Sequence, residues 1–254
     1  MSADVAVRDA STVVLLRDGE GLEVWLMTRV TQMVFAAGMA VFPGGRVDDS
    51  DADLPFVGGS DAHAAARFGC EPAHARALLG AAVREVFEET GVLLSVPSAD
   101  LAHARSDVEA GRVPFGDLLR THELAVDGEA VRPWSRWVTP PGEVRRYDTR
   151  FFVAAMPGHA EAQDVTTESS SAGWFGVGAA LESAQRGELG MLPPTIMTLA
   201  SLVGYASVAE VIEAAAERSL DPVRPTVEQT EDGGYLATLP DGTSFPLPRS
   251  LFPS

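Results

Sequence analysis

The chain has 254 residues, of which 46% are hydrophobic and 22% are charged. This length and composition are typical of one large globular domain or two small ones, with enough apolar side chains for a sizeable core. The formal net charge of −17 argues against a general nucleic-acid-binding protein, because such proteins are usually basic. A small anionic substrate would need local arginines or a bound metal ion to overcome this negative field.

Cysteine usage and hydropathy favour a cytoplasmic protein. Cys70 is the only cysteine, so no internal disulfide is expected, and a reducing compartment fits. Residues 1–10 carry charges and lack the apolar core of a signal peptide. No stretch reaches the roughly 18 apolar residues of a membrane-spanning helix. We therefore expect a cytoplasmic location and no membrane partner.

The expected elements, taken in chain order, are those of a single α/β domain over residues 1–254. Strands are expected at residues 11–18, 21–30, 39–42, 134–141, 145–157 and 172–177. Helices are expected at residues 72–90, twice between 99 and 122, at 178–188 and at 193–220. The Pro-Gly-Gly sequence at 43–45 is expected to form a loop, and Asp-Gly pairs favour a β-hairpin in the tail. Residues 190–254 are interpreted as a helical C-terminal extension.

The helix that begins at Pro72 has an amphipathic pattern and an unusual distribution of charge. Glu85, Glu88 and Glu89 lie on the flank of its apolar stripe, just before Gly91, a residue that favours a helix C-terminus. The stripe itself follows helical spacing and consists of Ala75, Leu78, Leu79, Ala82, Val83 and Val86.

Carboxylates are unfavourable at this end of a helix. The last carbonyls carry partial negative charge, and each acid there costs roughly 0.3–1 kcal/mol. Arg84 lies four residues before Glu88 and can relieve one of the three acids. A divalent cation that prefers oxygen ligands, such as Mg²⁺ or Mn²⁺, would stabilise the others. A solvated acidic face with an Arg84–Glu88 ion pair is the alternative explanation.

The sequence REVFEETGV at residues 84–92 resembles the second half of the Nudix box. The first half departs from the pattern, because Arg76 and Cys70 stand where that spacing requires glutamate and glycine. Upstream, the sequence FPGGRVDDSD resembles the family's usual loop, and Asp51 follows Gly45 at the spacing of the missing glutamate. The box is therefore expected to be divided by an insertion at residues 52–75.

Other motifs are similar to a Nudix branch that includes peroxisomal coenzyme A diphosphatases and bacterial relatives. The sequence GMAVFPGG at 38–45 resembles the end of a coenzyme A signature, and Arg29 fits an arginine of that signature. Val34 occupies the position of a second arginine in the signature. The sequences WVTPPGEVRRYDTRFF at 137–152 and LPPT at 192–195 also resemble this branch.

The resemblance implies a fold, an activity and a cofactor. The fold would be the Nudix α/β/α sandwich, in which a mixed sheet lies between helices. The activity would be a Mg²⁺- or Mn²⁺-dependent pyrophosphohydrolase that cleaves a nucleoside diphosphate joined to another group, with coenzyme A or acyl-CoA as the favoured substrate. ADP-ribose or a dinucleotide such as NADH is the alternative substrate. A non-catalytic Nudix-fold ligand sensor is a further alternative, disfavoured because such a domain is expected to lose the box acids.

The resemblance also assigns roles to individual residues. The expected metal ligands are Glu85, Glu88, Glu89 and the backbone carbonyl of Gly45. Arg84 would orient Glu88, and the general base would be a box glutamate or Glu168, which precedes Trp174 by six positions. The expected substrate-binding residues are Arg29, Gly38, Gly44, Arg145 and Arg146. An ion pair with Asp148 is an equal alternative for the last two arginines. The analogy also allows a homodimer.

Overall fold

The central sheet is built around β1, Val7–Asp18, whose uninterrupted apolar run is buried on both faces. Successive side chains of a strand point to opposite faces. Val13 and Leu15 are therefore buried in one core, and Val14 and Leu16 in another. The computed structural model describes residues 5–29, 38–59, 61–163, 169–231 and 233–247.

The main sheet is mixed, and its strands follow the order β10-β2-β1-β9-β8-β11. Strand β1 pairs in parallel with β9 and antiparallel with β2, while the short strands β3 and β4 pair with β2 and β1. The strands that accompany β1 are β2 (Leu22–Arg29), β3 (Ala40–Val41), β4 (Gly44–Arg46), β8 (Arg132–Val138), β9 (Arg146–Ala155), β10 (Ser169–Gly176) and β11 (Pro222–Val223).

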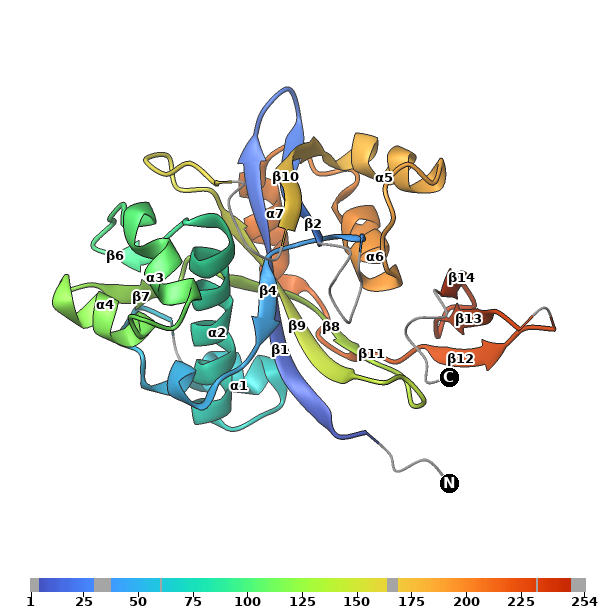
Figure 1. Ribbon diagram of the computed structural model, residues 1–254, viewed down its shortest axis with the longest axis horizontal. Coiled ribbons are helices and arrows are strands. Elements are labelled where there is room, and N and C mark those ends of the chain that lie inside the picture. The colour runs from blue at the N-terminus through green and yellow to red at the C-terminus, as the bar shows by residue number, and fades with distance from the viewer. Residues whose placement is uncertain (1–4, 30–37, 60, 164–168, 232, 248–254) are drawn as a thin grey trace.

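Helices cover both faces of this sheet, as Figure 1 shows. One face carries α1 (Asp61–Phe68), α2 (Pro72–Thr90), α3 (Arg105–Glu109) and α4 (Phe115–Thr121), with the 3₁₀ helices η1 (Asp49–Asp53) and η2 (Ala102–Ala104). The other face carries α5 (Val177–Gln185), α6 (Pro193–Leu202), α7 (Val208–Ala214) and the 3₁₀ helix η3 (Ala215–Glu217). The apolar stripe predicted on α2 is buried, which confirms the amphipathic pattern. The arrangement confirms the predicted α/β sandwich.

Two expected elements differ in the structure. The Pro-Gly-Gly sequence is not a free loop, because Gly44–Arg46 forms β4 and pairs with Ala10–Thr12 of β1. The long helix expected at 193–220 is interrupted between α6 and α7. Gly204 has φ of 101°, a conformation that glycine favours, and the Ser207 side chain accepts a hydrogen bond from the backbone N–H of Glu210 and so begins a new helix.

The C-terminal region contains more strand than expected. The predicted hairpin is confirmed and is part of a three-stranded antiparallel sheet: β12 (Thr226–Gln229), β13 (Tyr235–Thr238) and β14 (Ser244–Leu247). Figure 1 shows this sheet on the side of the molecule opposite α2. A third small sheet consists of β5 (Phe56–Val57), β6 (Ser95–Val96) and β7 (Ala125–Asp127). Among the described helices, none is both long and apolar enough to cross a membrane.

Candidate active site

The C-terminal turns of α2 carry the three clustered glutamates. The helix ends at Gly91, which has φ of 75° and donates its backbone N–H to the Phe87 carbonyl at 2.9 Å. Arg105, from α3, donates an Nη1 hydrogen bond to the backbone carbonyl of Glu88 at 2.8 Å. A guanidinium therefore lies against the negative end of the helix, where it offsets part of the cost of the acids.

Arg84 is the central cation of this cluster. Its Nε and Nη2 donate to the two carboxylate oxygens of Asp51 at 2.8 and 3.0 Å, and both residues are buried. Its Nη1 donates to Glu85 at 2.8 Å and reaches Glu88 at 3.3 Å. The predicted Arg84–Glu88 contact is present, but the bidentate pair with Asp51 is the shorter interaction. A bidentate arginine–carboxylate pair fixes the orientation of both groups.

The 3₁₀ helix η1, which carries Asp51, packs closely on α2. A Cβ atom on Gly80 would lie 2.3 Å from the Asp51 carbonyl oxygen, so a larger residue would push η1 away from the helix. Arg76 donates to the carbonyls of Ala52 and Leu54 at 2.9 and 2.8 Å. These contacts place Asp51 beside Arg84 although the two residues lie 33 positions apart in the chain.

The two glycines of β4 bring backbone close to two of the acids. The Gly44 N–H donates to Glu89 Oε2 at 2.6 Å. A Cβ atom on Gly45 would lie 2.5 Å from Glu85 Oε1, so only a glycine leaves this carboxylate in place. On the other side, a Cβ atom on Gly44 would lie 2.4 Å from the Ser11 carbonyl oxygen of β1. Both positions therefore favour glycine because neighbouring atoms leave no room for a Cβ atom, and not only because of the backbone conformation.

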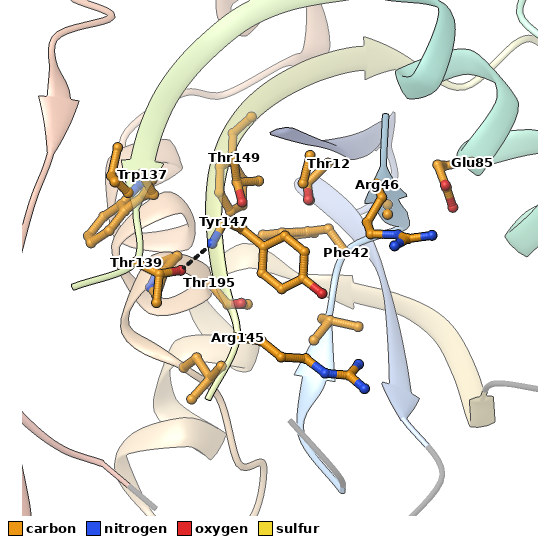
Figure 2. Close-up of a pocket in the computed structure, with 18 of the residues that line it drawn as sticks. Thr12, Phe42, Arg46, Glu85, Trp137, Thr139, Arg145, Tyr147, Thr149 and Thr195 are labelled. Carbon is orange, nitrogen blue, oxygen red and sulfur yellow. Dashed lines mark hydrogen bonds between the residues drawn. The ribbon is translucent and has the colours of Figure 1, made fainter. Parts of the chain in front are cut away.

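A cavity of about 460 Å³ opens in front of these acids. We call Asp48, Glu85, Glu88, Glu89 and Glu109 its acid wall, and Trp137–Pro140, Glu143, Arg145 and Tyr147 its loop wall. The remaining lining comes from β1, β3, β4, β9, Phe42, the segment Leu192–Thr195 and the C-terminal residues Pro225, Ala237 and Leu247. Figure 2 shows Glu85 on one side of the cavity and Trp137 on the other, with Tyr147 between them in this view.

Burial disfavours the charged form of two glutamates of the acid wall, Glu85 and Glu88. Burial raises the pKa of Glu85 to about 7; the charge of Arg84 opposes this shift and the charge of Glu88 adds to it. Burial also raises the pKa of Glu88, again against the effect of Arg84. Burial alone would lower the pKa of Arg84, but its hydrogen bond to Asp51 and the nearby carboxylates hold it above its ordinary value. A further positive charge at the acid wall would favour the ionised carboxylates.

The chemistry of the acid wall fits a divalent cation that prefers oxygen ligands. Carboxylates and a backbone carbonyl are the ligands that Mg²⁺ and Mn²⁺ prefer. In the described part of the chain, no three His, Cys, Asp or Glu side chains are close enough together to form a metal site as they stand. Glu85 and Glu88 are instead hydrogen-bonded to Arg84, and Glu89 accepts from Gly44. A metal ion would require these side chains to turn into the cavity.

The structure brings some of the predicted substrate-binding residues to the cavity. Arg145 is exposed and lines it, and Gly44 does so from β4. Arg146 is not among the described lining residues; its guanidinium donates to the carbonyls of Thr139 and Val5, each at 3.3 Å. Asp148, the alternative partner of these arginines, pairs with Arg136 at 2.6 Å and with Arg150 at 3.0 Å.

For the three other predicted residues, the structure describes the side-chain environment of neither Arg29 nor Glu168, and it places Gly38 outside the described cavity lining. Arg29 ends β2, opposite Ser169 of β10, but its side chain is outside the description. Gly38 lies in an exposed turn with φ of 71° and is not among the described lining residues. Glu168 lies outside the described residues.

Sequence reasoning missed several residues that line the cavity. Arg46 follows the second glycine of β4, and neither it nor Arg145 has an ion-pair partner among the described residues. Glu109 lines the acid wall from α3, where it accepts a hydrogen bond from Arg105 at 2.8 Å. Glu143 lines the loop wall and is only 6% exposed. The position of Arg46 directly after the Gly-Gly pair was a usable signal, whereas Glu109 and Glu143 stand in no motif.

Comparisons with known proteins find related sequences over most of the chain. A family model described as the NUDT19 Nudix domain matches residues 72–202, slightly more than half of the chain. The acyl-coenzyme A diphosphatase NUDT19 of Xenopus laevis is 26% identical over 272 residues, which cover 88% of this chain and 71% of that protein. The Homo sapiens protein of the same name is 27% identical over 262 residues, which cover 84% of this chain and 70% of that protein.

The fold is shared with solved Nudix structures. The crystal structure of a NUDIX hydrolase from Alicyclobacillus acidocaldarius is 30% identical to this chain and superimposes with a TM-score of 0.71. The match covers 83% of this chain and 97% of that structure. The chain therefore belongs to the Nudix hydrolase family, in the group that the NUDT19 Nudix domain describes.

Proposed function

We propose that the protein is a Mg²⁺- or Mn²⁺-dependent pyrophosphohydrolase whose substrate is coenzyme A or an acyl-CoA. The observation that carries the proposal is that the three box glutamates and the exposed residues Arg46 and Arg145 line one cavity. Two relatives that align with more than four-fifths of the chain are acyl-coenzyme A diphosphatases, which favours this substrate class.

The cavity suits a diphosphate joined to larger groups. Its volume of about 460 Å³ lies within the range of small-molecule sites, roughly 300–1,000 Å³. Arg46 and Arg145 can each donate two parallel hydrogen bonds to phosphate oxygens. Figure 2 shows both guanidinium groups on the Glu85 side of the Tyr147 ring in this view. In a protein with a net charge of −17, two such arginines supply the local positive charge that an anionic substrate needs.

Hydrolysis of the diphosphate adds a water oxygen to one phosphorus and breaks its bond to the bridging oxygen. Both products are phosphate monoesters, and the water proton passes to a general base. A bound divalent metal would polarise the phosphoryl oxygens and lower the pKa of the attacking water. Glu85, Glu88, Glu89 and the Gly45 carbonyl would hold it, while Arg84, fixed by its pair with Asp51, would remain beside Glu88 and orient it. The base would be a box glutamate or Glu168.

A direct test incubates the full-length protein with coenzyme A, an acyl-CoA, ADP-ribose and NADH. Each is supplied with Mg²⁺, with Mn²⁺ or with a chelator, and the products are separated by chromatography and identified by mass. We expect metal-dependent conversion of coenzyme A or acyl-CoA to two phosphate monoesters. Cleavage of ADP-ribose or NADH alone would contradict the proposed substrate but not the reaction. Nucleotide binding without any cleavage would contradict the reaction and indicate a ligand sensor.

A further inference from the structure

Glu143 is a buried carboxyl group that the proposed chemistry does not use. It lies in the connection between β8 and β9, lines the loop wall of the cavity and is only 6% exposed. The connection is held by hydrogen bonds between its ends: Thr139 N–H donates to the Tyr147 carbonyl at 2.8 Å, and Tyr147 N–H donates to Thr139 Oγ1 at 3.0 Å. Figure 2 shows the second of these bonds beside the cavity.

Among the described residues, no hydrogen bond or ion pair to the Glu143 carboxyl group is found, and its oxygen atoms are not among the fully enclosed side-chain atoms that lack a partner. Burial raises its pKa to about 7, and the charge of Arg146 opposes the shift. Glu143 therefore reaches the cavity without a partner from the protein, and a largely buried polar group is stabilised by a hydrogen-bond partner. Since Glu143 faces a cavity, a partner can come from a bound ligand.

The surroundings of Glu143 differ from those of the box acids. The loop wall to which it belongs also contains Trp137, Pro140 and Tyr147, which contribute aromatic and apolar side chains to the lining. The charges of the box glutamates do not contribute to the pKa shift of Glu143, whereas the charge of Glu88 contributes to the pKa shift of Glu85. Glu143 therefore lies in the same cavity as the acid wall but outside its cluster of charge.

We infer that Glu143 recognises the amino edge of a nucleobase, adenine in an adenine nucleotide substrate, while the acid wall acts on the diphosphate. The inference rests on the proposed function and adds a specificity-determining residue to it. Aromatic and apolar surface suits the face of a base, and a carboxyl group suits its edge.

The hydrogen-bonding capacity of Glu143 matches the edge of adenine. In either protonation state a carboxyl oxygen can accept a hydrogen bond from the 6-amino group, and the neutral form also donates its O–H to ring N1. A glutamine offers the same pair of acceptor and donor, which is how this amide pairs with adenine in other settings. Leucine offers neither. The two substitutions thus separate hydrogen bonding from the filling of space.

The test measures binding by calorimetry and needs no turnover. The two probes are AMP and purine riboside 5′-monophosphate, which is AMP with hydrogen in place of the 6-amino group. We expect the unaltered protein to bind AMP about tenfold more tightly than the second probe. Glu143→Leu should bind the two within about twofold of each other, and Glu143→Gln should keep the preference for AMP.

Glu161→Leu is the matched control, because Glu161 is exposed and is not among the described residues that line the cavity. It should behave as the unaltered protein. A preference for AMP that survives in Glu143→Leu, or that is absent from the unaltered protein, would overturn the inference. Thermal unfolding of each variant confirms that it is folded. Since hydrolysis is assayed separately, base recognition without cleavage would contradict the proposed function and leave the role of Glu143 standing.

Discussion

The acid wall and the loop wall of the cavity are built in different ways. The three box glutamates of the acid wall lie on one helix, and short contacts fix this region. Arg84 pairs with Asp51, Glu89 accepts a hydrogen bond from Gly44, and Glu85 packs against Gly45. The loop wall holds Arg145 and Glu143, for which no ion pair or hydrogen bond of the side chain is found among the described residues. The comparison indicates that the protein itself orients the acid wall, whereas we propose that a ligand supplies the missing partners of the loop wall.

The largest expected effect concerns the Arg84–Asp51 pair. Asp51→Asn removes the partner charge of a buried guanidinium, and breaking such a pair typically costs roughly 3–5 kcal/mol of unfolding free energy. We expect a loss in that range in urea denaturation. Asp49→Asn is the control, because Asp49 lies in the same 3₁₀ helix but is exposed. Equal stabilities of the two variants would show that Asp51 does not hold the acid wall together.

Glu143 should show the opposite behaviour, because its burial destabilises the fold at high pH. Its pKa is raised from 4.5 to about 7, which at 1.36 kcal/mol per pKa unit corresponds to about 3 kcal/mol. The folded state binds this proton more tightly than the unfolded state, so stability is retained below pH 4.5 and lost as the pH rises to 7. Glu143→Gln should therefore gain stability relative to the unaltered protein between pH 4.5 and 8. A difference in unfolding free energy between the two proteins that does not change with pH would contradict the raised pKa of Glu143.

The two glycines of β4 offer a sharper comparison within the acid wall. Gly45→Ala meets the end of the Glu85 side chain, which can move, so the fold should persist while turnover falls roughly a hundredfold. Gly44→Ala meets backbone atoms of Ser11 and Thr12, which cannot move freely, so stability itself should fall. Thermal unfolding and the hydrolysis assay together separate the two outcomes. Loss of stability in Gly45→Ala with intact turnover would reverse the interpretation.

The smallest expected effect concerns the two arginines of the cavity. Arg46→Ala and Arg145→Ala each remove a charged hydrogen-bond donor worth roughly 1.5–3 kcal/mol. Since these groups would bind substrate phosphates, the Michaelis constant should rise about tenfold or more. Arg112→Ala is the control, because Arg112 is exposed and pairs with Asp107 away from the described cavity lining. Unchanged Michaelis constants in both variants would place the phosphates elsewhere.

The acid wall was largely predictable from the sequence, for a physical reason. Its helix follows from the spacing of Leu78, Leu79, Ala82 and Val86, and its end follows from Gly91. The spacing of Gly45 and Asp51 indicated that the box continues upstream of the insertion, and the structure places Asp51 against Arg84. Local spacing and one motif were sufficient there, because most of the wall lies on one continuous element.

The loop wall could not be predicted in the same way. Glu143 has no periodic pattern around it, and its burial depends on the fold of the β8–β9 connection and on packing against other parts of the chain. The contributions of Pro225, Ala237 and Leu247 depend on where the C-terminal sheet packs. The contact between Asp148 and Arg136 could not be predicted from local spacing either, because Arg136 reaches Asp148 from the neighbouring strand β8.

The most direct test of the account compares the unaltered protein with Glu88→Gln in Mn²⁺-dependent hydrolysis of coenzyme A, with thermal unfolding recorded for both. Glu182→Gln, at an exposed position on α5, serves as the matched control. We expect kcat/KM to fall roughly a hundredfold or more in Glu88→Gln alone, with little change in its unfolding temperature. Hydrolysis of coenzyme A by Glu88→Gln at the rate of the unaltered protein would contradict the claim that the acid wall performs the reaction.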